Sequence, residues 1–150
     1  MTDVLDIKIA TMEGTQTTLR QLGGNRWLVV NVASACGSTP QYEGLQEIHA
    51  SNEEVTVVGF PCNQFGAQEP GTHLEICEFA AGTYNVDFPL MAKVDVKGEG
   101  KTGLYSALSE VADAEGYSGD IRWNFEKFLI ESDCTIQRFP TRVKPENIVL

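Results

Sequence analysis

The chain has 150 residues, 42% of them apolar, and a formal net charge of −10 at pH 7. This size fits one domain with a substantial core, so we expect residues 1–150 to form a single domain. The negative charge argues against nucleic acids and anionic membranes as partners, and no apolar stretch is long enough to span a bilayer. Because acidic residues occupy the N-terminus where a secretory signal needs bases, we expect a cytoplasmic protein.

The first half of the chain predicts a strand–helix–strand unit preceded by two short strands, at residues 5–9 and 16–19. After a glycine turn, residues 27–32 form an apolar run typical of a buried strand. A helix is expected over residues 40–51, with Ser38 or Thr39 as its N-cap. A second buried strand follows at residues 55–60. Such a unit indicates a parallel pair of strands.

The second half continues the alternation of helices and strands. Thr72 and Glu75 have the spacing of a capping box, which predicts a helix over residues 72–84. The other expected elements are a strand at 91–96, a helix containing Leu104, Leu108 and Val111, a hairpin of residues 128–130 and 136–139, and a final turn at 145–147. The whole pattern predicts an α/β fold with a central mixed sheet flanked by helices.

Cys36 stands between the first buried strand and the helix that follows it. Unpaired N–H groups and the positive end of the helix dipole favour a thiolate at such a place. A reactive cysteine of this kind is usual in thioredoxin-like folds. The position three residues on is Thr39 and not a second cysteine, so any second sulfur comes from elsewhere in the chain. The alternative interpretation is an inert buried thiol.

Three sequence blocks resemble the glutathione peroxidase family in its cysteine (non-selenium) branch: Asn31–Gly37, Gly59–Gly71 and Trp123–Leu129. Their order and spacing match as well. The resemblance implies a thioredoxin-like fold, with Cys36 as the cysteine that attacks peroxide. It also implies that Gln68, Trp123 and Asn124 complete a catalytic tetrad. Taken singly, these three residues would be a loop amide, a core aromatic and a turn residue.

The chemistry explains why these residue types are useful beside a reactive sulfur. The carboxamides of Gln68 and Asn124 and the indole of Trp123 are uncharged hydrogen-bond donors. Directed at the sulfur they stabilise its thiolate, and directed at the peroxide they stabilise the charge that develops on oxygen.

A second cysteine is needed if the oxidised Cys36 is to be resolved as a disulfide. Many thioredoxin-dependent members of the family carry it on the helix predicted at residues 72–84, near the place of Ala80 or Ala81. Here the cysteine of that helix is Cys77, which either resolves Cys36 or is structural. If it resolves, the helix must open. Cys62 is expected to be a packed thiol, and Cys134 is expected to have no role in the reaction.

The sequence therefore predicts a thiol peroxidase that reduces hydrogen peroxide and organic hydroperoxides. Its reductant is expected to be thioredoxin or a low-molecular-weight thiol, with thioredoxin favoured because glutathione is anionic and the chain is acidic. No metal or other cofactor is expected, because no histidine or cysteine pair has ligand spacing. In the family that the sequence resembles, a longer insertion before the block that begins at Trp123 is the oligomerisation loop. By that resemblance, the short connector at residues 115–119 implies a monomer. Two alternatives are a redox relay that passes a disulfide to a partner protein, and a binding module without catalysis.

Overall fold

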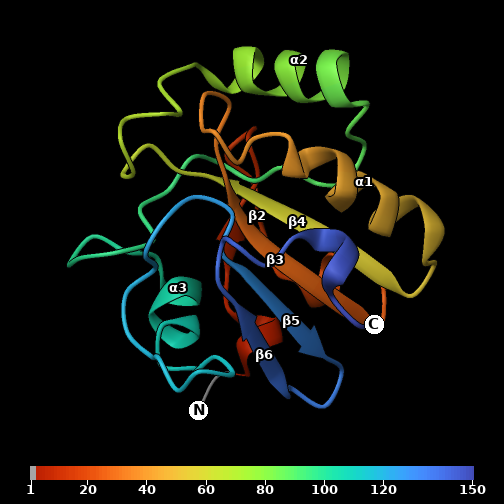
Figure 1. Ribbon diagram of the computed structural model, residues 1–150, viewed down its shortest axis with the longest axis vertical. Coiled ribbons are helices and arrows are strands. Elements are labelled where there is room, and N and C mark those ends of the chain that lie inside the picture. The colour runs from red at the N-terminus through yellow and green to blue at the C-terminus, as the bar shows by residue number, and fades with distance from the viewer. Residues whose placement is uncertain (1–2) are drawn as a thin grey trace.

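The computed structural model describes residues 3–150 as a mixed four-stranded sheet with helices on both of its faces (Figure 1). The regular elements are, in chain order, β1 (Ile9–Ala10), β2 (Gln16–Thr17), β3 (Arg26–Val32), α1 (Gln41–Ser51), β4 (Val55–Pro61), α2 (His73–Tyr84), α3 (Gly103–Leu108), β5 (Lys127–Glu131) and β6 (Ile136–Phe139). Short 3₁₀ turns lie at Val4–Asp6, Arg20–Leu22 and Pro145–Asn147.

The strand order in the main sheet is β4-β3-β5-β6. β3 and β4 run parallel, whereas β5 is antiparallel to both β3 and β6. All of β4 and nearly all of β3 are buried, as expected for adjacent strands covered on both faces. The predicted α/β fold with a mixed central sheet is thereby confirmed.

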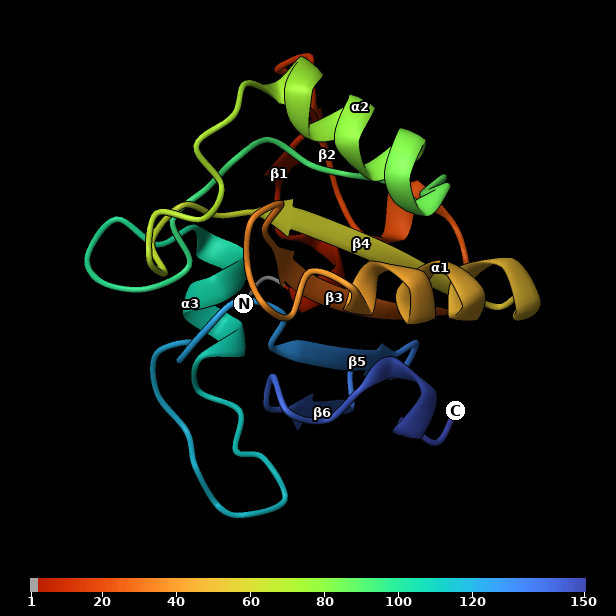
Figure 2. The same ribbon diagram turned by 45° about the horizontal axis from the view of Figure 1, so that its top comes forward.

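Alternate residues of β3 pack into two separate cores, because successive side chains of a strand point to opposite faces. Trp27 and Val29 join the core that includes α3 and the N-terminal segment. Leu28 and Val30 join the core that includes α1 and Ala80 of α2. Figure 2 shows α1 and α2 near each other and α3 well apart from them.

The helix predicted at residues 72–84 is confirmed, with a complete capping box. The Thr72 hydroxyl accepts a hydrogen bond from the N–H of Glu75, and the Glu75 carboxylate accepts one from the N–H of Thr72. The prediction that Ser38 or Thr39 caps α1 is wrong. The Thr39 hydroxyl instead accepts from the N–H of Cys36 and donates to the carbonyl of Ala33, so it is not available to the helix.

Several of the expected strands and helices are shorter than the sequence predicts, and of the strand expected at residues 16–19 only β2 forms. Residues 5–9 do not form one strand, because the Asp3 carboxylate caps a 3₁₀ turn at Leu5 and leaves only β1. The segment 91–96 forms no regular strand: Met91 makes a single bridge to Thr11, and Leu90, just before the segment, makes one to Gly59. α3 ends at Leu108, before Val111.

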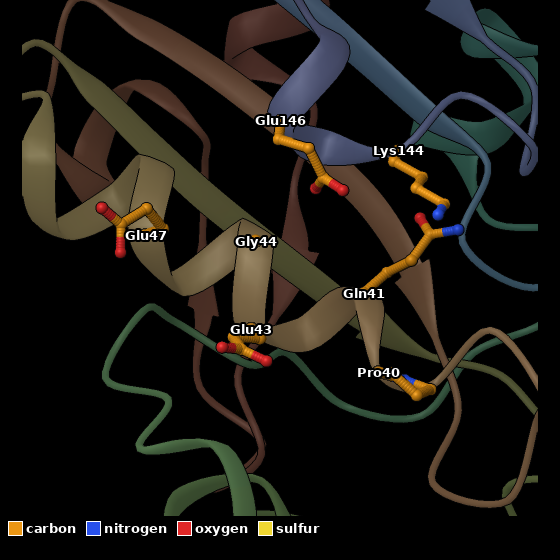
Figure 3. Close-up of a pocket in the computed structure, with 7 residues that line it drawn as sticks. All are labelled: Pro40, Gln41, Glu43, Gly44, Glu47, Lys144 and Glu146. Atoms are coloured by element: carbon orange, nitrogen blue, oxygen red, sulfur yellow. The ribbon is translucent and has the colours of Figure 1, made fainter.

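The turn expected at residues 145–147 packs against α1 at Gly44 (Figure 3). A Cβ atom at Gly44 would lie 2.9 Å from a carboxylate oxygen of Glu146 and 3.0 Å from the Cβ of Pro145. The absence of a side chain at Gly44 therefore lets the C-terminal turn lie directly on the helix. In the part of the chain that is described, no helix has both the length and the apolar character that a membrane crossing requires.

The burial of Lys127 in β5 can be tested through the pH dependence of stability. This lysine is fully buried, with Nζ 3.1 Å from the carbonyl oxygen of Thr141, and burial lowers its pKa to about 7 from an ordinary 10.5. Between these two pH values the unfolded chain binds more protons at this site than the folded chain does. Lys127 should therefore make stability rise with pH from about 7 to 10.5.

We expect the urea midpoint of the wild type, measured relative to that of Lys127→Met, to rise across this pH range. The same substitution at the exposed Lys8 is the matched control and should show no such trend. A constant difference between wild type and Lys127→Met from pH 7 to 10 would show that the lysine stays charged in the folded protein.

Candidate active site

Three chain segments meet at one end of the sheet. Val32 pairs with Pro61, so β3 and β4 end side by side. Val30 pairs with Lys127 in the antiparallel direction, so β5 begins at the same place (Figure 1). The loops that carry Cys36, Gln68 and the pair Trp123–Asn124 leave the sheet at these three points. Carboxyl ends of parallel strands are where α/β folds commonly build their sites.

Cys36 lies in the turns that precede α1 and is 7% exposed. Its sulfur accepts a hydrogen bond from the N–H of Ser38 at 3.3 Å. The N–H of Cys36 donates to the Thr39 hydroxyl at 2.9 Å, which holds the loop closed around the sulfur. The sulfur thus lies in a closed loop with one backbone N–H directed at it.

The loop that contains Gln68 is fastened to the Cys36 loop by backbone contacts. The N–H of Ala35 donates to the carbonyl oxygen of Gln68 at 3.0 Å. Just before Gln68 the backbone is left-handed at Gly66 (φ 66°) and Ala67 (φ 51°). This tight reversal brings Gln68 next to the residue that precedes Cys36.

Asn124 contacts Gln68 directly. Its Nδ2 donates to Oε1 of Gln68 at 3.1 Å and to the carbonyl oxygen of Phe65 at 3.5 Å, and Asn124 is fully buried. Because its oxygen accepts from Asn124, Gln68 has its NH₂ group turned to the other side of the carboxamide. Asn124 thus orients Gln68, whereas the sequence had suggested that both amides donate to the reacting atoms.

Trp123 lies at the rim of the site and not in the core. It is 39% exposed, and its ring centroid lies 5.8 Å from that of Phe65. The structure therefore brings Gln68 and Asn124 into contact and places Trp123 beside them on the Phe65 ring. The link from this group to Cys36 runs through the backbone of Ala35.

Glu69 is a residue of this region that sequence reasoning did not single out. It is fully buried, and its Oε1 accepts from the N–H of Ser34 at 3.0 Å. Burial raises the pKa of this carboxyl, while hydrogen bonds from Ser34 and the charge of Lys93 act in the opposite direction. The sequence feature that could have identified Glu69 is its position directly after Gln68 in the Gly59–Gly71 block.

The remaining cysteines occupy three different environments, and all four cysteines are free thiols. Cys77 is half-buried on α2, with its sulfur 3.0 Å from that of Met12, and burial raises its pKa. Cys62 is fully buried in the core on the other face of the sheet from the core that contains Cys36. Cys134 follows β5, whose end pairs with the beginning of β3, so it lies at the opposite end of the sheet.

A cysteine in the loop between a buried strand and a helix, at the end of a mixed sheet, defines a thioredoxin-like thiol protein. The crystal structure of T. cruzi GPX1 matches with a TM-score of 0.76 at 29% identity, covering 97% of this chain and 91% of that one.

The sequence matches the family described as glutathione peroxidase over residues 4–109. It is 42% identical to "Glutathione peroxidase-like peroxiredoxin 2" of Saccharomyces cerevisiae, covering 98% of this chain and 93% of the yeast protein. It is 40% identical to "Thioredoxin/glutathione peroxidase BtuE" of Escherichia coli, covering 98% and 92%. The chain belongs to the glutathione peroxidase family and is a thiol peroxidase.

Proposed function

We propose that Cys36 is the nucleophile of this peroxidase and that residues 1–150 act as one catalytic domain. The thiolate attacks one oxygen of a hydroperoxide, a sulfur–oxygen bond forms and the O–O bond breaks. Cys36 becomes a sulfenic acid, and the leaving oxygen takes up a proton to become water or an alcohol. The observation that carries this assignment is the hydrogen-bonded connection from the Cys36 loop to Gln68 and Asn124.

The neighbouring side chains have separable roles in this proposal. Gln68 supplies its NH₂ group to the departing oxygen of the peroxide, since its own oxygen is already engaged by Asn124. The indole N–H of Trp123 is a second uncharged donor at the rim. Asn124 acts by holding Gln68 in this orientation.

Cys77 is proposed to resolve the oxidised Cys36. Its thiol condenses with the sulfenic acid, a disulfide forms and water leaves. The support is that α2 packs on the same face of the sheet as α1, with Ala80 in the core that also contains Cys36. The start of α2 is held by the β1–β2 loop, where His73 lies 3.2 Å from the Met12 carbonyl oxygen. These contacts would have to break for α2 to move.

A protein dithiol of the thioredoxin class is the proposed reductant. Arg122 and Arg142 line a surface pocket beside Trp123, which would suit an anionic thiol if their charges were free. Arg122 is instead paired with Asp113 and Glu126, and Arg142 with Glu115. The name of the Escherichia coli relative includes both thioredoxin and glutathione. Substrates would be hydrogen peroxide and organic hydroperoxides.

Replacing Cys36 by Ser should abolish peroxidase activity, because an alcohol is not ionised near neutral pH.

Gln68→Ala should lower the second-order rate constant for peroxide on the order of 10²- to 10³-fold, the usual effect of losing one donor to a developing charge. Stopped-flow measurement of Cys36 oxidation gives this constant. Gln46→Ala removes a glutamine that bonds Asp87 on the surface and is the matched control. Activity in Cys36→Ser would refute the assignment.

Cys77→Ala should lose turnover with thioredoxin but keep one stoichiometric oxidation of Cys36. Mass spectrometry after one equivalent of peroxide should find a Cys36–Cys77 bridge in the wild type and a sulfenic acid in the variant. Cys134→Ala, which removes a thiol from the far end of the sheet, should behave as wild type. Normal thioredoxin-linked turnover of Cys77→Ala would exclude Cys77 as the resolver.

The protein is further proposed to be a cytoplasmic monomer that binds neither membranes nor nucleic acid. The short 115–119 connector and the net charge of −10 support this. Sedimentation velocity at micromolar concentration should give one species near 16.4 kDa. A dimer under those conditions would contradict the proposal.

A further inference from the structure

Asn31 is a fully buried polar residue near the end of β3, and it has no role in the reaction steps proposed above. Three of its polar atoms bond one short segment of chain. Its Nδ2 donates to the carbonyl oxygen of Trp123 at 3.0 Å, and its Oδ1 accepts from the N–H of Glu126 at 3.1 Å. Its carbonyl oxygen accepts from the N–H of Phe125 at 2.6 Å.

These contacts begin where regular pairing between β3 and β5 stops. The last pair of that ladder is Val30 with Lys127. Beyond it Phe125 has a left-handed backbone (φ 63°), which is costly for a residue with a bulky side chain and persists only where its surroundings hold it. The side chain of Asn31 supplies the hydrogen bonds that a ladder can no longer make.

The segment that Asn31 holds is the one that carries Trp123 and Asn124. Asn31 is also five residues before Cys36 on the strand that leads to it. The Glu126 carboxylate accepts from the N–H of Arg122 at 3.0 Å, which closes the segment on itself, and from Nε of Arg138 in β6 at 2.7 Å. Asn31 joins this segment to β3, the strand that leads to the reactive cysteine.

We propose that Asn31 is a positioning residue of the peroxidase reaction, acting through the carbonyl of Trp123 to hold Asn124 and Gln68 at a set distance from the Cys36 loop. The inference rests on the proposed roles of those residues. A displacement of about 1 Å in such donors is enough to cost about 100-fold in rate.

The principal test is Asn31→Asp, which keeps the shape and the acceptor for Glu126 but, with its carboxylate ionised, has no donor for the carbonyl of Trp123. Two rate constants are measured: Cys36 oxidation by hydrogen peroxide, and Cys36 alkylation by iodoacetamide. Alkylation depends on the sulfur but does not require donors to a departing oxygen. We expect oxidation to slow on the order of 10- to 100-fold, with alkylation changed by no more than about 3-fold.

The matched control is Asn52→Asp. Asn52 also donates through Nδ2 to a backbone carbonyl, that of Ile48 at 3.0 Å, but at the end of α1 remote from Cys36. Both of its rate constants should stay at the wild-type values. Asn31→Ala is the second variant at the proposed position, since it removes the side-chain donor without burying a carboxylate. Circular dichroism establishes that each variant is folded.

A double-mutant cycle with Asn124→Ala then asks whether Asn31 acts through this segment. In the Asn124→Ala background, Asn31→Asp should have little further effect on oxidation. The inference is overturned by wild-type oxidation in both Asn31 variants, by an equal fall in alkylation, by an undiminished effect in the double variant, or by failure of both Asn31 variants to fold. If Asn124→Ala itself oxidises at the wild-type rate, the proposed role of Asn124 fails, and the inference with it.

Discussion

The site depends on one connected set of hydrogen bonds at the end of the sheet. Ala35 donates to the carbonyl of Gln68, and the carboxamide of Gln68 accepts from Asn124. Each bond joins segments that are far apart in the sequence, so each exists only because β3, β4 and β5 place their ends together. A buried donor or acceptor that is left without its partner costs about 1–3 kcal/mol. Displacing one of these three segments would therefore leave buried groups unsatisfied on its neighbours.

Buried polar groups gather around this end of the molecule and support the same geometry. Glu126 is fully buried and paired with Arg138, whose Nε lies 2.7 Å from the Glu126 carboxylate. Glu69 accepts from Ser34 on the side of the Cys36 loop. The buried charges of Glu126 and Arg138 are tolerated because each is the partner of the other, since an unpaired buried charge carries a large desolvation cost. These contacts join β6 to the segment that follows Asn124 and join Glu69 to the Cys36 loop.

The sheet also separates the four thiols. Cys36 and Ala80 of α2 share one core, while Cys62 belongs to the core on the other face. Strand register places Cys134 at the end of β3 opposite to Cys36. At rest, α2 is the element that carries a second thiol on the face of the reactive sulfur, so movement of α2 is the structural change that a bridge to Cys77 would need.

The sequence by itself determined the class of fold, the strand–helix–strand unit around Cys36 and the limits of α2, because apolar runs and capping spacings are local signals. Only the tertiary structure decided that the Thr39 hydroxyl closes the Cys36 loop instead of capping α1, and that residues 91–96 make bridges without a strand. It also decided the contacts of Asn31 and Glu69. Their partners lie 92 and 35 residues away, a separation that no local pattern encodes.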